Sequence, residues 1–243
     1  MMKVAPTIVF LFKDSDGLAT AIADALHPTT GSSFHRLEDS FELSLARYGI
    51  QDVKAKGNLI HFIDNDSNYQ VSVLLMDKYE PPNLVCALSE VLTQIIGEAS
   101  AGLLTLIVPF IGTSTKLKWE SRTSTKDDSK VSIYGERIGP ETDITRAIAS
   151  RTQKPPSSLQ VHYEPLACFL QLVSVLKLPT SVLIGQRARS GSDKAAEGEL
   201  EILYEIGELL ASTTCLCFLR EKLIWNPENA TKDSKEPWRA LYG

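Results

Sequence analysis

An apolar helix that runs directly into an apolar strand, between residues 164 and 185, constrains the fold of this chain most strongly. Leu166, Phe169 and Val173 recur at three- and four-residue spacing, which predicts a largely buried helix. Leu178-Pro179 ends the helix, and residues 180–184 are mostly β-branched or leucine without alternation, which is typical of a strand covered on both faces. A buried helix that feeds a buried strand is half of a crossover unit, so the segment predicts an α/β fold.

The rest of the chain supplies further strands and helices in alternation. Besides 180–184, we expect strands at 7–12, 59–63, 69–75 and 103–108, and helices at 18–26, 83–96, 143–150 and 200–210. The turn formers at 64–68 join two of the strands as a β-hairpin. Because a hairpin is combined with helical crossovers, the sequence predicts a three-layer α/β/α sandwich with a mixed central sheet.

Three stretches carry weaker patterns. Residues 34–50 are expected to form a short helix lined by Phe41, Leu45 and Tyr48. Residues 113–130 are rich in serine, threonine, lysine and aspartate, so we interpret them as a polar insertion, followed by a short strand at 131–134. Residues 187–198 are expected to form a second polar loop, and periodicity leaves strand or helix open for 215–219.

Composition excludes several classes of function. The 243 residues favour one α/β domain, at 1–225, over two small domains. Thirty acidic residues outnumber 25 basic ones, giving a net charge of −5, so no nucleic-acid partner is expected. The apolar run 103–111 is about half the roughly 20 residues of a membrane span, and the run 7–12 is too short for a signal peptide. We therefore expect no membrane partner and a cytoplasmic localisation, with the nucleus as a second compartment.

The residues that could do chemistry form no recognised constellation. Gly112 to Lys116 follows a strand but lacks the glycine-lysine order of a phosphate-binding loop, and 187–192 pairs two arginines that could hold an anion. For both, a solvated loop is the favoured interpretation. His27, His35, His61 and His162 stand without a nucleophile and carboxylate at a catalytic spacing, and Cys215-Leu216-Cys217 lacks a second ligand pair. The sequence thus predicts no catalytic residue, no cofactor and no metal.

The last part of the sequence differs from the rest. Residues 226–236 have the composition of a solvated tether, and the sequence then continues Trp238-Arg239-Ala240-Leu241-Tyr242-Gly243. Trp238 and Leu241 could fold back onto the domain surface. Alternatively, the segment docks into a partner's pocket through an apolar anchor, a tyrosine and a carboxylate. We favour docking and expect 226–243 to be a flexible tether with a docking tail.

Three stretches of the sequence resemble the proteasome assembly chaperone 1 family. Leu241-Tyr242-Gly243 matches the hydrophobic-Tyr-any signature by which proteasome activators and assembly factors insert between α-subunits of the core particle. Glu164-Pro165-Leu166-Ala167 with the helix and strand that follow, and the opening strand with Asp16-Gly17-Leu18-Ala19, are similar to the same family. The resemblance implies a fold related to nucleoside phosphorylases and a non-enzymatic activity. It further implies a heterodimer with an assembly chaperone 2-like subunit that caps the α-ring, with Leu241, Tyr242 and Gly243 as the partner-binding residues.

Two alternatives remain beside this interpretation. A nucleoside-processing enzyme on the related fold would need a pocket at strand ends with convergent polar groups. A non-catalytic scaffold subunit of another complex would need only a binding surface. For the chaperone, we expect pairing through apolar faces of the helices at 83–96 and 200–210.

Overall fold

The computed structural model describes residues 2–13, 17–98, 104–112, 116–118, 133–186 and 194–223. The main strands are β1 (Thr7–Phe12), β3 (His35–Ser44), β4 (Lys54–Ile63), β5 (Tyr69–Met76), β6 (Thr105–Gly112), β8 (Ile133–Ile138) and β10 (Thr180–Gln186). The helices are α1 (Leu18–Ala25), α2 (Asn83–Glu98), α3 (Asp143–Ala149), α4 (Glu164–Val175) and α5 (Lys194–Thr213), with short 3-10 turns η1 (Ala46–Tyr48) and η2 (Arg220–Lys222). Two small pairs join β2 (Leu26–Pro28) to β11 (Leu216–Phe218) and β7 (Leu117–Lys118) to β9 (Gln160–Val161).

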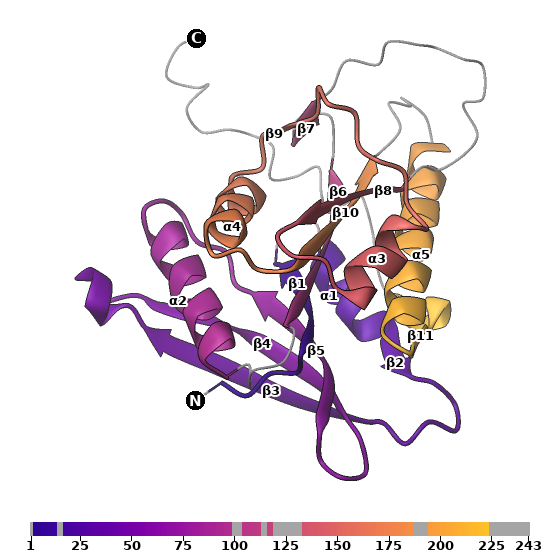
Figure 1. Ribbon diagram of the computed structural model, residues 1–243, viewed down its shortest axis with the longest axis horizontal. Helices are drawn as coiled ribbons and strands as arrows, with labels where there is room; N and C mark the ends of the chain where they lie inside the picture. Colours follow the sequence, from indigo (N-terminus) through magenta and orange to yellow (C-terminus); the bar gives the residue numbers. More distant parts are fainter. Residues whose placement is uncertain are drawn as a thin grey trace.

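The seven main strands form one sheet in the order β3-β4-β5-β1-β6-β10-β8 (Figure 1). Its four inner strands β5, β1, β6 and β10 run parallel, and Val9 of β1 lies between Val73 and Ile107. β4 and β3 on one side, and β8 on the other, are each antiparallel to their inner neighbour. The sheet is therefore mixed, as the hairpin and crossovers predict.

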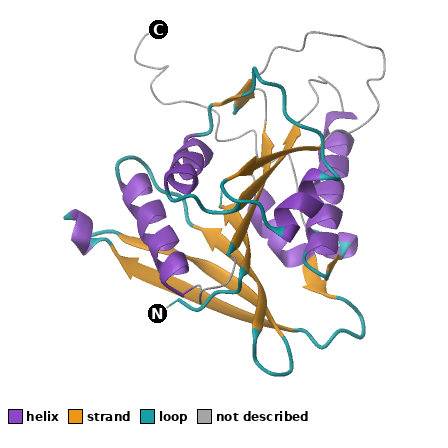
Figure 2. Cartoon of the chain, viewed as in Figure 1, coloured by secondary structure: helices purple, strands orange, loops and turns teal. Residues whose placement is uncertain are grey.

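Helices cover both faces of the sheet, and each face has its own apolar core (Figure 2). Successive side chains on a strand point to opposite faces. In β1, Ile8 and Phe10 pack with α2 and α4, whereas Val9 and Leu11 pack with α1, α3 and α5. The expected three-layer α/β/α sandwich with a mixed central sheet is thus confirmed.

The unit predicted between residues 164 and 184 lies in the middle of this fold. α4 buries Leu166, Phe169 and Val173, and β10 pairs in parallel with β6. Between them Lys177 adopts a φ of 51°, and the N–H of Leu178 donates to the Val173 carbonyl at 2.9 Å. This is a Schellman ending with lysine at the left-handed position where glycine is usual, and it turns the chain sharply from helix to strand.

The prediction of a short helix at 34–50 is wrong. Most of this segment is the edge strand β3, and only η1 is helical. Phe41 is buried in the core beside α2, while Glu42 receives ion pairs from Lys54 at 3.0 Å and Lys56 at 2.8 Å on β4. An edge strand with charged residues shows little alternation of apolar and polar positions, which is why periodicity misassigned it.

Smaller differences concern the ends of elements. α1 begins after Gly17, at φ 69°, with no side-chain cap. β4 begins at Lys54, five residues before the predicted strand, and β8 extends the strand expected at 131–134 to Ile138. The undecided segment 215–219 contains the strand β11.

Two further expectations concern the division of the chain into domain and tail, and membrane spans. Residues 226–243 lie outside the described residues, so the division into a domain at 1–225 and a docking tail stays a prediction. No helix within the described ranges is long and apolar enough to cross a membrane.

Candidate functional site

The crevice at the carboxyl end of β1 is the position where this topology could hold a ligand. The chain leaves β1 and reaches β5 on one side, and α2 then carries it from β5 to β6 on the other side of β1. In open α/β sheets, ligands bind outside the carboxyl ends of strands where the connections diverge in this way. A nucleoside-processing enzyme would therefore be expected to use this crevice.

Aromatic rings occupy this crevice. Phe12 ends β1, Phe110 lies in β6, and Tyr163 immediately precedes α4. The rings of Phe110 and Tyr163 stack at 5.1 Å, and Phe12 meets Tyr163 edge-on at 6.2 Å. Phe169 of α4 completes the group at 5.8 Å from Phe12. These contacts belong to the core between sheet and α4, and we call the four residues the ring cluster.

Little space remains beside the ring cluster. The cavity there measures about 20 Å³, against the roughly 300–1,000 Å³ of pockets that bury a small ligand. Its walls are Leu11, Phe12, Leu18, Ala19, Ile22, Pro109, Phe110, Ile111 and Tyr163. Tyr163 is the one titratable side chain among these lining residues, so the described walls include no acid-base pair of the kind that catalysis uses.

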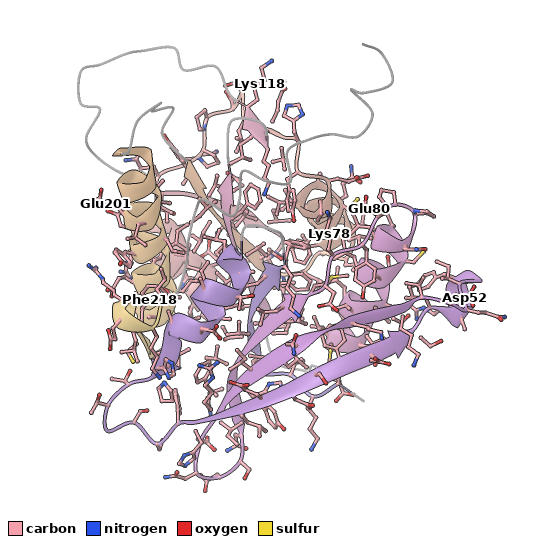
Figure 3. The ribbon with its side chains drawn as sticks, turned by 180° about the vertical axis from the view of Figure 1, so that it is seen from behind. Asp52, Lys78, Glu80, Lys118, Glu201 and Phe218 are labelled. Atoms are coloured by element: carbon pink, nitrogen blue, oxygen red, sulfur yellow. The ribbon has the colours of Figure 1, made fainter. Side chains whose placement is uncertain are left out.

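A second cavity, of about 180 Å³, lies at the beginnings of α2 and α4. Its lining residues are Lys78, Tyr79, Glu80, Leu84, Lys116, Tyr163, Glu164 and Pro165. Lys116 lies over the Tyr163 ring at 5.0 Å. The ammonium of Lys78 is 3.7 Å from the Glu80 carboxylate, and Figure 3 labels these two residues next to each other. Two lysines and two glutamates give this cavity no net preference for one sign of charge.

A third cavity, of about 250 Å³, lies on the opposite face of the sheet beside α1. Four of its five charged lining residues, Lys13, Asp24, Arg36 and Glu38, take part in ion pairs. Arg36, whose side chain is 18% exposed, lies 3.0 Å from Glu38 and 3.7 Å from Asp24, and Lys13 lies 2.7 Å from Asp77. Cross-paired charges of this kind are typical of a solvated sheet surface rather than of a ligand site.

His27 joins three elements next to this cavity. Its Nε2 lies 3.3 Å from the Arg36 guanidinium and 3.2 Å from the Lys222 ammonium. Burial, and then the positive charges of Lys222 and Arg36, hold the pKa of His27 below its ordinary value. The same Nε2 lies 2.9 Å from the Asp24 carbonyl oxygen, which can only accept, so Nε2–H donates to that carbonyl and the two cations lie beside the ring. His27 thus holds the end of α1 next to β3 and η2 as a structural residue.

His61 is also structural. It is buried in β4, and its Nδ1 lies 2.9 Å from the Ser72 hydroxyl oxygen, which accepts a hydrogen bond from the Ala5 N–H at 2.9 Å. Burial lowers the pKa of His61 below its ordinary value. Its hydroxyl partner Ser72 is fully buried between strands, where no substrate could reach it, so His61 fits the sequence interpretation of a satisfied strand histidine.

Most of the exposed large apolar side chains of the described residues gather on α2 and α4. The described residues include five large apolar side chains classed as exposed, and four of them lie on or directly after these two helices. They are Val85 (43% exposed), Ile96 (40%), Val175 (78%) and Leu176 (42%). Apolar patches on a soluble protein commonly mark contact sites for other proteins. The α2/α4 layer, meaning this outer surface, is therefore the candidate interaction site.

The residues predicted to bind a partner, Leu241, Tyr242 and Gly243, lie outside the described residues. So do Thr113 to Thr115 of the phosphate-loop look-alike and the arginine pair at 187–192. The cysteines are all unpaired, and no group of three or more potential metal ligands occurs in the described ranges. The sequence interpretation missed the ring cluster, although aromatic residues near the ends of two predicted strands, Phe12 and Phe110, were its visible signal.

Comparison with known proteins identifies a family without an assigned activity. A family described as "Domain of unknown function (DUF7894)" matches residues 2–243. A search of curated proteins finds no relative.

Solved structures give similarity at the level of the fold. A protein of unknown function from Corynebacterium glutamicum is 13% identical with a TM-score of 0.53, over 100% of this chain and 84% of that one. Pyrococcus furiosus PbaB, an archaeal proteasome activator, is 9% identical with a TM-score of 0.48, over 100% and 96%. An MTA/SAH nucleosidase is 11% identical with a TM-score of 0.42, over 87% and 95%.

Proposed function

The chain belongs to the DUF7894 family, and we propose that it is a non-catalytic chaperone of proteasome assembly. In this proposal it pairs with a related, assembly chaperone 2-like α/β subunit and caps the α-ring of the core particle during assembly. The Leu241-Tyr242-Gly243 tail docks in a pocket between α-subunits, and the protein acts in the cytoplasm and nucleus without cofactor, metal, nucleic acid or membrane.

The tail sequence is the observation that carries this proposal. Leu241-Tyr242-Gly243 combines an apolar anchor, a tyrosine and a following residue in the order that proteasome-docking segments use. In an inter-subunit pocket, Leu241 would lose contact with water and the Tyr242 hydroxyl would gain a hydrogen-bond partner. The polar stretch 226–236 gives the tail the reach of a tether.

The ring cluster supports the non-catalytic part of the proposal. A nucleoside-processing enzyme on a related fold would need room and convergent polar groups at the carboxyl end of β1. Phe12, Phe110 and Tyr163 pack against one another at that position and leave a cavity of about 20 Å³. A packed aromatic core at this position favours a scaffold over a catalyst.

The pairing part of the proposal rests on α2 rather than on α5. The sequence alone predicts that the partner subunit is contacted through apolar residues of both helices. Ile202, Leu203 and Ile206 of α5 are buried in the chain's own core, whereas Val85 and Ile96 of α2 remain on the surface. A partner can therefore cover apolar residues of α2, but those of α5 are already covered.

Affinity purification from native cells tests the proposal. We expect α-subunits and assembly intermediates to copurify with the intact chain, and to be lost from Tyr242→Ala and from a chain ending at Ala240. Hot-spot truncations of this kind cost about 2 kcal/mol or more each, which is about a 30-fold loss of affinity. Asn229→Ala, in the tether, is the matched control and should retain binding.

The same variants separate docking from folding. Melting temperatures should be equal for all four proteins, since the docking residues are placed outside the apolar pattern of the domain. Undiminished recovery of α-subunits by the truncated chain, or a lower melting temperature, would contradict the docking tail. Turnover of nucleosides that disappears when a residue lining the cavity is changed would contradict the non-catalytic assignment.

A further inference from the structure

The α2/α4 layer carries almost no charge. α2 has 16 residues and α4 has 12, and their charged residues are Glu90, Glu98 and Glu164. Glu90 is 5% exposed and pairs with Arg47, so it contributes little to the surface. α5, in the opposite layer, has six charged residues in 20. Depletion of charged residues, more than a surplus of apolar ones, is what distinguishes the core of a protein interface from ordinary surface.

A charged partner would be a poor match for this surface. A charge buried against Val85, Ile96 or Val175 would lose its water without gaining a counter-charge, at a cost of several kcal/mol. The occupant must itself present an uncharged, partly apolar surface. Among the helices of the described chain, α2 and α4 together provide such a surface, and a second copy of the chain would bring it in the same shape.

We propose that the α2/α4 layer is a dimer interface, occupied by the α2/α4 layer of a second copy of this chain related by a two-fold axis. This inference rests on the pairing step of the proposed function: it assigns the surface for that step, and it replaces the related subunit named there by a second copy of this chain. In a two-fold interface the same patch meets itself, so the patch must be self-complementary.

The charges at the two ends of α4 meet this requirement. Exposed Glu164 begins the helix, and exposed Lys177 follows its end. In an antiparallel pairing of α4 with its symmetry mate, Glu164 of each copy faces Lys177 of the other. The two helix dipoles also oppose each other in this arrangement, which places each helix start beside the other helix end.

The size of the layer places the dimer among the small interfaces. At about 1.5 Å per residue, α2 is about 24 Å long and α4 about 18 Å. Two such helices packed about 10 Å apart cover roughly 20 by 24 Å, or about 480 Å² per copy. The roughly 1,000 Å² of both copies is at the low end of specific interfaces, so we expect a reversible dimer with a dissociation constant on the order of micromolar.

Analytical ultracentrifugation of the purified full chain, from about 1 to about 100 µM, measures this equilibrium. We expect concentration-dependent dimerisation, and a monomer throughout for Ile96→Lys with Val175→Lys. Both positions lie in the last turn of a helix and on its surface, where lysine suits the helix dipole. Ala147→Lys, at an exposed position in the last turn of α3 in the other layer, is the matched control and should dimerise as the original chain does.

Charge reversal tests the antiparallel arrangement. Glu164→Lys should weaken the dimer roughly two- to tenfold, since exposed ion pairs contribute little each and the symmetry repeats the pair. Adding Lys177→Glu to the same chain should restore the dimer, because the reversed charges again oppose each other. A Glu164→Lys chain that is not rescued would overturn the antiparallel pairing of α4.

The outcomes are independent of the proteasome. A chain that remains monomeric to about 100 µM, or a double-lysine variant that dimerises unchanged with the melting temperature of the original chain, refutes this inference. So does a chain that stays monomeric alone but pairs with a different subunit. Loss of α-subunit copurification with dimerisation intact would refute the proposed function and leave the dimer in place.

Discussion

Replacing Phe169 by alanine tests whether the ring cluster is a structural core or a binding site. Phe169 is fully buried, and its ring lies 4.7 Å from that of Phe10 and 5.8 Å from that of Phe12. Truncating a buried phenylalanine costs about 3–5 kcal/mol, the sum of lost apolar burial and the cavity left behind. At roughly 2–4 °C per kcal/mol for a domain of this size, the melting temperature should fall by roughly 6–20 °C. A ring retained for ligand binding would behave differently, since removing binding-site residues commonly costs little stability.

Urea denaturation followed by circular dichroism measures the effect. Phe169→Leu, which keeps most of the volume, should cost less than about 1.5 kcal/mol, and it keeps the test readable if the alanine chain does not fold. Leu37→Ala is the matched surface control, because Leu37 is 44% exposed and should cost less than about 0.5 kcal/mol. A loss below about 1 kcal/mol for Phe169→Ala would refute the assignment of the ring cluster to the core.

Three further predictions concern pH, a buried carboxylate and two glycines. Burial lowers the pKa of His61 below its ordinary value of 6.5, so below pH 6.5 the unfolded chain binds a proton at this histidine more readily than the folded chain does. The urea midpoint should therefore fall as the pH drops below 6.5, and it should fall less in His61→Gln. Arg47→Ala should cost about 1–3 kcal/mol in urea denaturation and more than Glu90→Gln, because it strands a buried carboxylate that Arg47 Nε approaches at 2.7 Å; an equal or smaller loss would contradict this. Gly57→Ala should lower the free energy of unfolding by about 1–3 kcal/mol, because the new Cβ would lie 2.3 Å from a backbone carbonyl oxygen of β5. Gly97→Ala, whose Cβ would have no atom within 4 Å, should instead raise the melting temperature, because alanine stabilises α2 more than glycine does.

Buried, strongly periodic elements were predictable from the sequence. The strand 7–12 and the 164–184 unit are found where the pattern places them, because continuous apolar runs can be satisfied only inside the fold. The edge strand β3 was not predictable in this way. Its residues face solvent on one edge and meet paired charges of β4, so local periodicity carries little information about it.

The candidate site was predictable only in part. Leu241, Tyr242 and Gly243 stay a sequence prediction. The ring cluster depends on contacts between residues far apart in the chain, such as Phe12 with Tyr163, and no local pattern specifies such contacts. Once the strand order is known, Phe12 at the end of β1 is seen to lie at the crevice where the chain connections diverge.

The contrast between α2 and α5 explains why apolar content alone misjudged the interaction surface. Both helices have strong apolar stripes, and from the stripes alone both are expected to exceed what one layer of the sheet can cover. In the structure α5 is flanked by α3 and β11, which helps to bury its stripe, while α2 has α4 as its neighbour in the layer and leaves Val85 and Ile96 outside. The difference was nevertheless present in the sequence as charge. α5 has glutamates between its apolar residues, as a helix in water requires, whereas α2 has serine, threonine and valine at its outward positions. A helix without charge on its outer face is adapted to contact protein on both sides, which is why the α2/α4 layer, and not α5, is the surface on which a partner should be sought.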